Sequence, residues 1–124
     1  MQKQKQCRMM AGSDAKRDET PWGRLVWMAS ASLGNSESMT LGRCEILPGH
    51  INYHHLHPNC DEILYLIEGE ILHHAGEEKP FAMKPGDSIS IPAGIPHYAE
   101  NTGPGMAIML VVFSSANRET QMLP

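Results

Sequence analysis

Two patterned segments constrain what this chain can fold into. The first places two histidines and a glutamate between two glycines, in the order Gly49, His55, His57, Glu62 and Gly69. The second places a histidine after turn-forming residues and before an asparagine, in the order Gly86, Pro92, Gly94, His97 and Asn101. Imidazole and carboxylate groups spaced among turn residues predict a metal site carried by short β-strands.

Alternation along a strand explains how these side chains can reach one ion. His55 and His57 are two residues apart, so they point to the same face of an extended strand. The turn-rich residues 58–61 can reverse the chain and let Glu62 begin the neighbouring antiparallel strand. His97 is remote in sequence, so it can join the site only in the folded protein. Three neutral imidazoles and one carboxylate normally leave coordination positions open for chemistry.

Both segments resemble the two sequence motifs of the cupin superfamily at every fixed position, and the short stretch between them is typical of small single-domain microbial cupins. The resemblance covers roughly residues 25–115. It implies an all-β fold, the double-stranded β-helix or jelly-roll barrel. It also implies one divalent metal ion, Fe, Mn, Zn or Ni, whose ligands are His55, His57, Glu62 and His97.

The length of the chain, 124 residues, allows one closed core and is too short for a second. Residues 1–20 are rich in Gln and Lys and nearly free of large aliphatic side chains, so we expect a flexible tail there and a single barrel domain over residues 21–124. The alternative for the tail is a helix, or an arm that crosses to a partner subunit. Gly and Pro punctuation predicts short strands at 22–29, 39–47, 51–57, 62–67, 71–75, 81–83, 88–91, 97–100 and 106–114.

Charge and composition narrow the partners and the compartment. No apolar run could span a bilayer and no apolar stretch follows the basic N-terminal residues, so we expect a cytoplasmic protein without a membrane partner. Residues 1–20 have a net charge of +2 and the remaining 104 residues one of −6, which disfavours nucleic acid as a partner. Three cysteines without a C-x-x-C pair predict reduced thiols.

The alternation of side chains along a strand also predicts which other residues point toward the expected metal. Tyr53 shares the face of His55 and His57, which makes it the candidate catalytic residue, by hydrogen bonding or proton transfer. The alternative is a tyrosine at the mouth of the barrel with its hydroxyl in water. Of the neighbours His73 and His74, one ring should point inward, and the sequence does not decide which.

The metal site favours an enzyme that acts on a small, neutral or singly anionic oxygenated metabolite, by isomerase or lyase chemistry or as an Fe-dependent dioxygenase. The alternative is a non-catalytic, metal-dependent binding or sensor protein for a small sugar or acid. Arg24 is the only cation expected in the cavity, whose apolar walls would come from Ile46, Leu64 and Leu66. Oxalate is disfavoured, because cupins that act on it commonly carry an arginine where this chain has residues 52–54, Asn-Tyr-His.

Assembly is the last expectation. Small jelly rolls leave exposed sheet edges and apolar outer patches, and Trp22 and Trp27 lie near the first expected strand. Pairing with a second copy would cover them, so the sequence predicts a homodimer.

Overall fold

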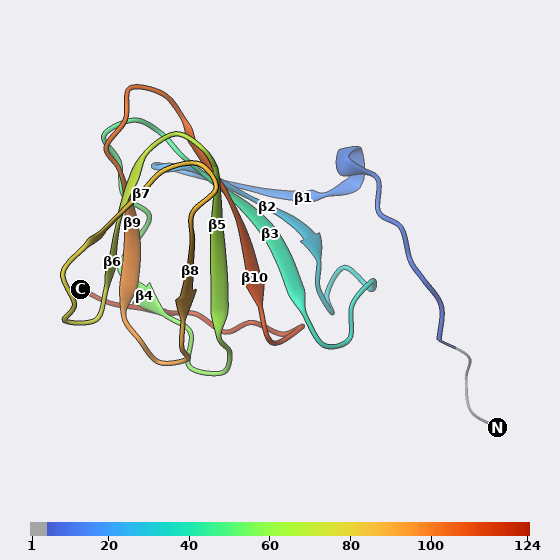
Figure 1. Ribbon diagram of the computed structural model, residues 1–124. Helices are drawn as coiled ribbons and strands as arrows, with labels where there is room; N and C mark the ends of the chain where they lie inside the picture. The colour runs from blue at the N-terminus through green and yellow to red at the C-terminus, as the bar shows by residue number, and fades with distance from the viewer. Residues whose placement is uncertain (1–4) are drawn as a thin grey trace.

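The computed structural model describes residues 5–124, which form two antiparallel β-sheets that face each other (Figure 1). The strand order is β1-β2-β3-β10-β5-β8 in one sheet and β11-β4-β9-β6-β7 in the other. The strands are β1 (Lys16–Thr20), β2 (Gly23–Ala29), β3 (Thr40–Ile46), β4 (His55–Leu56), β5 (Glu62–Glu68), β6 (Ile71–Ala75), β7 (Phe81–Met83), β8 (Ser88–Ile91), β9 (His97–Asn101), β10 (Ala107–Phe113) and β11 (Gln121–Met122). One short 3-10 helix, η1 (Gly12–Asp14), precedes β1.

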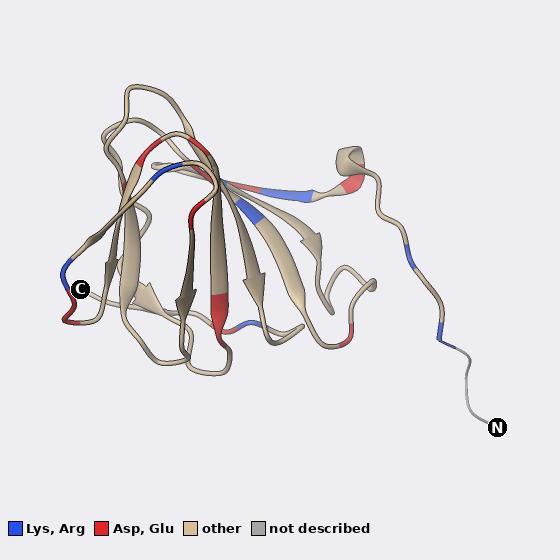
Figure 2. Ribbon diagram, in the orientation of Figure 1, with Lys and Arg blue, Asp and Glu red and all other residues tan. Residues whose placement is uncertain are grey.

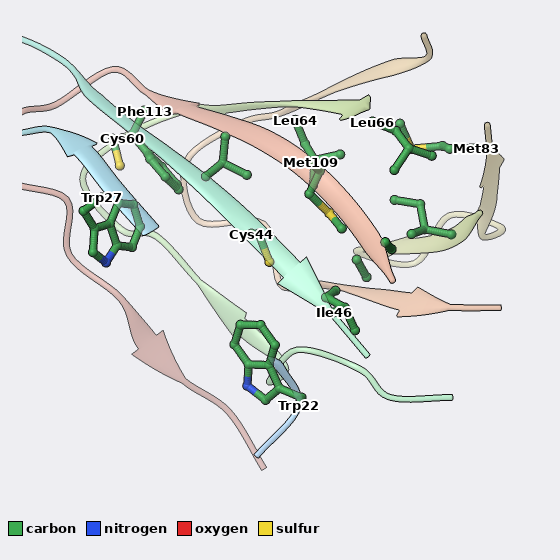
Figure 3. Close-up of a cluster of buried hydrophobic side chains, with 14 residues drawn as sticks. Trp22, Trp27, Cys44, Ile46, Cys60, Leu64, Leu66, Met83, Met109 and Phe113 are labelled. Carbon is green, nitrogen blue, oxygen red and sulfur yellow. The ribbon is translucent and has the colours of Figure 1, made fainter. Parts of the chain in front are cut away.

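The core lies between the two sheets, and the alternation of side chains along the strands builds it. In β10 every second residue, from Ala107 to Phe113, is buried, and in β5 the buried positions continue from Glu62 through Leu64 to Leu66. Figure 3 shows the apolar side chains among these, including Leu64, Leu66, Met109 and Phe113, gathered with Trp27 of β2 and with Cys44 and Ile46 of β3 in one cluster. Burying a leucine or phenylalanine side chain contributes about 1.5–3 kcal/mol, so this period-two pattern stabilises the all-β fold.

Two glycines of the sequence motifs have a backbone geometry that only glycine adopts readily. Gly69, between β5 and β6, has φ of 93°, and a Cβ there would lie 2.9 Å from the Cα of Ala107. Gly94 has φ of 83°, and its N–H donates to the carbonyl of His57 at a distance of 2.9 Å. The second glycine therefore joins the two motifs directly.

The strands expected at 22–29 and 39–47 are confirmed, and so is every strand expected from 62–67 to the end of the chain. Their bounds differ from the expected ones by one or two residues at most. The strand expected at 51–57 is shorter, because only His55–Leu56 pairs as a strand and Ile51 makes an isolated bridge to Glu100. The side chain of Asn52 takes over part of the pairing, since its Oδ1 accepts the N–H of Ala99 at 2.7 Å. No pattern in the sequence predicted β11, a strand of two residues.

The expectation of a flexible tail over residues 1–20 needs correction at residues 16–20, which form β1 and pair in register with β2. These residues are polar, so no hydrophobic pattern revealed the strand. An edge strand can be polar because its main-chain hydrogen bonds hold it, and here Asp18 also accepts a hydrogen bond from the indole N–H of Trp27 at 3.1 Å. Residues 5–11 lie outside any helix or strand, and residues 1–4 are outside the described part of the chain.

Charged side chains lie mostly in the loops and on β1, while the whole of β10 carries none (Figure 2). Across residues 5–124, the structure contains no helix with the length and apolarity needed to cross a bilayer.

Candidate metal centre

Four side chains from three strands and one loop converge at one end of the barrel. The potential ligand atoms of His55, His57, Glu62 and His97 all lie within 4.8 Å of one another. His55 on β4 and His97 on β9 are direct cross-strand partners, with ring centroids 4.4 Å apart, while Glu62 begins β5 in the opposite sheet. The site is therefore shared between the two sheets, and the structure brings together all four residues that the spacing predicted.

Backbone carbonyls orient the three imidazoles. Each ring has its Nδ1 at hydrogen-bonding distance from a carbonyl oxygen: that of Tyr53 for His55, of Glu119 for His57 and of Ile95 for His97. A carbonyl can only accept, so each Nδ1 carries the hydrogen. In the neutral form of each ring, the lone pair is then on Nε2, the atom that turns toward the other ligands.

The carboxylate of Glu62 completes a set of ligand atoms that can lie close together only with a proton or a cation between them. Its Oε1 lies 3.0 Å from Nε2 of His97 and 3.3 Å from Nε2 of His57. Burial by itself would raise the pKa of Glu62, but hydrogen bonds from these two rings outweigh it and lower the pKa to about 2. Burial, together with the nearby rings, lowers the pKa of His55 to about 4.

Glu62 is thus an anion at neutral pH and faces the Nε2 atoms of neighbouring imidazoles. Such acceptor atoms can lie this close only if protons or a cation lie between them. Three imidazole nitrogens and one carboxylate oxygen are a donor set that suits Fe, Mn, Zn or Ni. The donor set and its convergence fit one divalent metal ion.

The loop that carries His57 is anchored on both sides. Its carbonyl accepts the N–H of Gly94, and the carboxylate of Asp61 accepts the N–H of Ala93 at 2.9 Å. The N–H of Asp61 in turn donates to the hydroxyl of Ser114, also at 2.9 Å. The loop of the first motif is thereby fixed against the turn of the second, which holds the ligand geometry.

A cavity of about 110 Å³ opens onto these ligands. Its walls are largely apolar and include Trp22, Leu25, Trp27, Leu64, Val111, Phe113 and Met122. The volume is below that of the pockets that hold drug-sized molecules, so the cavity suits a small metabolite.

The predicted wall and cavity residues are only partly correct. Leu64 lines the cavity, whereas Ile46 and Leu66 are fully buried in the core away from it. The alternation of side chains along a strand predicted that they point inward, but not how far from the cavity they lie. Arg24 does not enter the cavity, because alternation along β2 turns Leu25 inward and Arg24 outward. On that outer face, Nε of Arg24 donates to the carboxylate of Glu45 at 2.8 Å.

Tyr53 lines the cavity at its mouth. Its side chain is 47% exposed, and its ring meets the edge of Trp22 with a centroid distance of 6.2 Å. This position is compatible with contact to a ligand and equally with a hydroxyl in water, so the catalytic role of Tyr53 stays a prediction.

Of the histidine pair, His73 is the one that points inward. It is 1% exposed, and its ring stacks on that of His97 with a centroid distance of 5.8 Å. Burial lowers the pKa of His73 to about 4, so the ring is neutral at neutral pH. His74 lies on the outer side, stacked on Tyr98 and 3.2 Å from the carboxylate of Glu100.

Arg118 is a cavity residue that sequence reasoning missed. It follows β10 near the C-terminus, where no periodic pattern predicts its neighbours. In the structure its guanidinium carbon lies 4.3 Å from the ring centroid of Trp27 and 5.2 Å from that of Phe113. Among the described residues that line the cavity, Arg118 is the only lysine or arginine.

Comparison with known proteins places these features in a family. Residues 42–113 match the cupin domain. A germin-like protein of Morus alba is 30% identical over 93 residues, which are 72% of this chain and 44% of that protein. The auxin-binding protein ABP19b of Prunus persica is 31% identical over the same shares of the two chains. The chain thus spans less than half the length of these relatives.

Solved structures show the same fold. Oxalate decarboxylase of Lactobacillus farciminis, in a formate complex, superposes with a TM-score of 0.82 at 25% identity, over 90% of this chain and 34% of that one. Oxalate decarboxylase of Bacillus subtilis at pH 4.6 superposes with a TM-score of 0.81 at 23% identity, over 87% of this chain and 29% of that one.

Proposed function

The chain belongs to the cupin family, and on that premise we propose that it is a mononuclear metal-dependent enzyme acting on a small, neutral or singly anionic oxygenated metabolite. One observation carries the proposal. Three carbonyl-oriented imidazoles and the anionic Glu62 converge at the end of a small, mostly apolar cavity. The proposed metal ligands, the negative charge of Glu62 and the space for a substrate therefore lie at one place.

The side chains of this site have distinct tasks. His55, His57, Glu62 and His97 would hold the ion, and their Nδ1 hydrogen bonds and the anchored loop fix their directions. A divalent ion bound there supplies Lewis-acid chemistry or, as Fe, reaction with dioxygen. The apolar walls exclude water and so strengthen the electrostatic interactions within the cavity.

Tyr53 is the proposed acid or base. Tyr53 is a residue of the cavity lining and is not a metal ligand of the proposed set. The other titratable side chains of the lining, outside the four ligands, are Cys44 and Arg118; burial raises the pKa of the Cys44 thiol, so it stays protonated. Tyr53→Phe should therefore lower turnover while leaving the metal content unchanged.

A non-catalytic metal-dependent binding or sensor protein is the second candidate. The observation in its favour is the scarcity of acid–base groups in the lining, where Tyr53 alone could transfer a proton, and it is half exposed to water. Such a protein would bind a small sugar or acid without converting it.

One experiment separates the two candidates. The protein is purified without added metal, analysed for its elements, and reloaded in parallel with Fe, Mn, Zn or Ni. Each form is then incubated with a set of small hydroxy acids, keto acids and sugars, with oxygen uptake and product NMR as readouts. Turnover that follows the bound metal supports the enzyme. Saturable binding without turnover for every metal form supports the sensor.

We also propose that the chain forms a homodimer, for a reason other than the two tryptophans. Both tryptophans are buried and line the cavity, so they are not surface patches. The outer face of the large sheet is the apolar surface instead: Ile63, Tyr65 and Ile67 of β5 are 50%, 44% and 44% exposed, beside the uncharged strand β10. Light scattering at roughly tens of micromolar should give twice the chain mass, and Tyr65→Glu should reduce it to the monomer.

A further inference from the structure

Arg118 lies at the wall of the cavity, where its side chain packs against aromatic rings. Its guanidinium stacks over Trp27 and contacts the ring of Phe113, which in turn meets His57 edge-on with a centroid distance of 4.8 Å. Trp27, Phe113 and His57 all line the same cavity as Arg118. Two contacts, one between Arg118 and Phe113 and one between Phe113 and His57, thus connect the charged group to a proposed metal ligand.

The backbone around Arg118 is fixed by the loop of the metal ligands. The side-chain amide of Asn59 donates to the carbonyl of Asn117 at 2.9 Å and accepts the N–H of Glu119 at 2.9 Å. These two hydrogen bonds clamp the chain immediately before and after Arg118. The guanidinium and the metal ligands are therefore parts of one connected structure, which keeps their relative placement.

The charge of Arg118 lacks a counter-ion in the described structure. Arg24 and Arg43 each donate to Glu45 at 2.8 Å, but Arg118 has no ion-pair partner among residues 5–124. Its one side-chain hydrogen bond there goes from Nη1 to the hydroxyl of Thr120. A guanidinium has five N–H donors, so most of its donor capacity is free.

The two carboxylates whose charges act on Arg118 are already engaged elsewhere. Glu62 faces the imidazoles of His57 and His97, and Asp18 accepts the indole N–H of Trp27. Placing a half-buried cation without a partner costs free energy, unless an anion binds to it. The planar fork of arginine matches a carboxylate, which can take two parallel hydrogen bonds.

We propose that Arg118 binds a carboxylate group of the ligand, so that the ligand of this cavity is a small monocarboxylate with a second oxygen directed toward the metal centre. The inference rests on the proposed function of the cavity as a metal-dependent ligand site. One cation in the lining matches one carboxylate, and a phosphate normally takes several cations or a row of main-chain amides. The apolar walls between Arg118 and the metal ligands contact the carbon skeleton.

Calorimetric titration of the metal-loaded protein tests the inference. The probes are glycolate, lactate and pyruvate, and the uncharged counterparts glycolamide and lactamide. At least one carboxylate should bind, with an affinity about tenfold or more above that of its amide, because a hydrogen bond to a charged group contributes about 1.5–3 kcal/mol. Arg118→Met keeps the apolar stem against Trp27 and should weaken carboxylate binding by a similar factor, while Arg118→Lys should have an intermediate effect.

Arg24→Met is the matched control, since Arg24 lies outside the cavity, and it should leave carboxylate binding unchanged. Metal content and thermal unfolding are measured for every variant, so a folding defect is seen directly. Equal carboxylate affinity in wild type and Arg118→Met, equal binding of acid and amide, or no binding of any carboxylate to the metal-loaded protein would each overturn the inference. A wild-type chain that binds no metal would instead show that the proposed function itself is wrong.

Discussion

His57 donates the hydrogen of its Nδ1 to the backbone carbonyl of Glu119, 2.9 Å away, although the two residues are 62 positions apart. The hydroxyl of Thr120 lies 3.3 Å from the same nitrogen. Hydrogen bonds of this kind fix the orientation of a metal-binding imidazole and raise its basicity. The segment after β10 therefore belongs to the metal centre as well as to the ligand cavity.

A chain that ends at Ala116 should bind metal about 10- to 100-fold more weakly, because it lacks the carbonyl that orients His57. The barrel should still fold, since the deleted part contains only the two-residue edge strand β11. A chain that ends at Thr120 also lacks β11 but keeps the carbonyl of Glu119, and it is the matched control. Competition with a metal-sensitive dye gives the affinities. Equal affinities for the two truncated chains would contradict the role of Glu119.

Asn59→Ala should reduce the free energy of unfolding by about 1 kcal/mol and weaken carboxylate binding at Arg118, because both clamping hydrogen bonds are lost. Asn59→Asp keeps the oxygen that accepts the N–H of Glu119 and loses the donor to Asn117. Its effect on urea unfolding and on ligand affinity should therefore be smaller. Should Asn59→Ala leave the affinity for carboxylates at the wild-type value, the clamp does not position Arg118.

Gly69→Ala should destabilise the protein by about 2 kcal/mol or more, because φ is positive there and the new Cβ would lie 2.9 Å from backbone atoms of Met106 and Ala107. Gly105→Ala is the control, since a Cβ at that position meets no atom within 4 Å. Its stability should stay within about 0.5 kcal/mol of the wild type. Urea unfolding of the two variants compares them; similar stabilities would argue against strain at Gly69.

Glu45 should make the stability of the fold depend on pH in the acid range. Burial would raise its pKa, but hydrogen bonds from Arg43 and Arg24 outweigh it and hold the pKa below its ordinary value. A carboxyl with a depressed pKa in the folded state stabilises the fold above its unfolded pKa, and that contribution is lost as the pH falls through the folded pKa. The stability difference between wild type and Glu45→Gln should thus shrink as the pH falls below the ordinary pKa of a glutamate, about 4.3.

Glu19→Gln provides the comparison for this titration. Glu19 is 72% exposed at its side chain and lies 3.9 Å from Arg24, so its loss should change the pH profile little. A pH-independent difference between wild type and Glu45→Gln, by thermal unfolding across the range, would contradict the depressed pKa.

Local patterns in the sequence predicted most of the fold, and long-range contacts account for what they did not predict. His55 and His57 share a face because side chains alternate, and turn residues mark where strands end, so both could be inferred from short segments. The inward turn of His73 depends on the register of β6 against β9, which no local pattern fixes. Strand β1 depends on pairing alone, since its residues are polar.

Arg118 shows the same limit within the site. Sequence parity could not place it, because it lies in a segment without a strand pattern and its position depends on Trp27 and Asn59, both more than fifty residues away. Arg24, by contrast, lies on a regular strand, and its outward direction follows from the inward Leu25 once the register of β2 is known.

The metal content of the purified protein tests the central claim most directly. Elemental analysis compares wild type with His57→Ala and His97→Ala, each of which lacks one proposed ligand, and with His54→Ala, which lacks none. Each protein is reloaded with the same ion and desalted. We predict one divalent ion per chain for wild type and for His54→Ala, whose histidine lies outside the four-residue set. His57→Ala and His97→Ala should lose most of the metal and remain folded, because the apolar core includes none of the four proposed ligands. An unchanged metal content in both of these variants, or a wild type that binds none, would contradict the account.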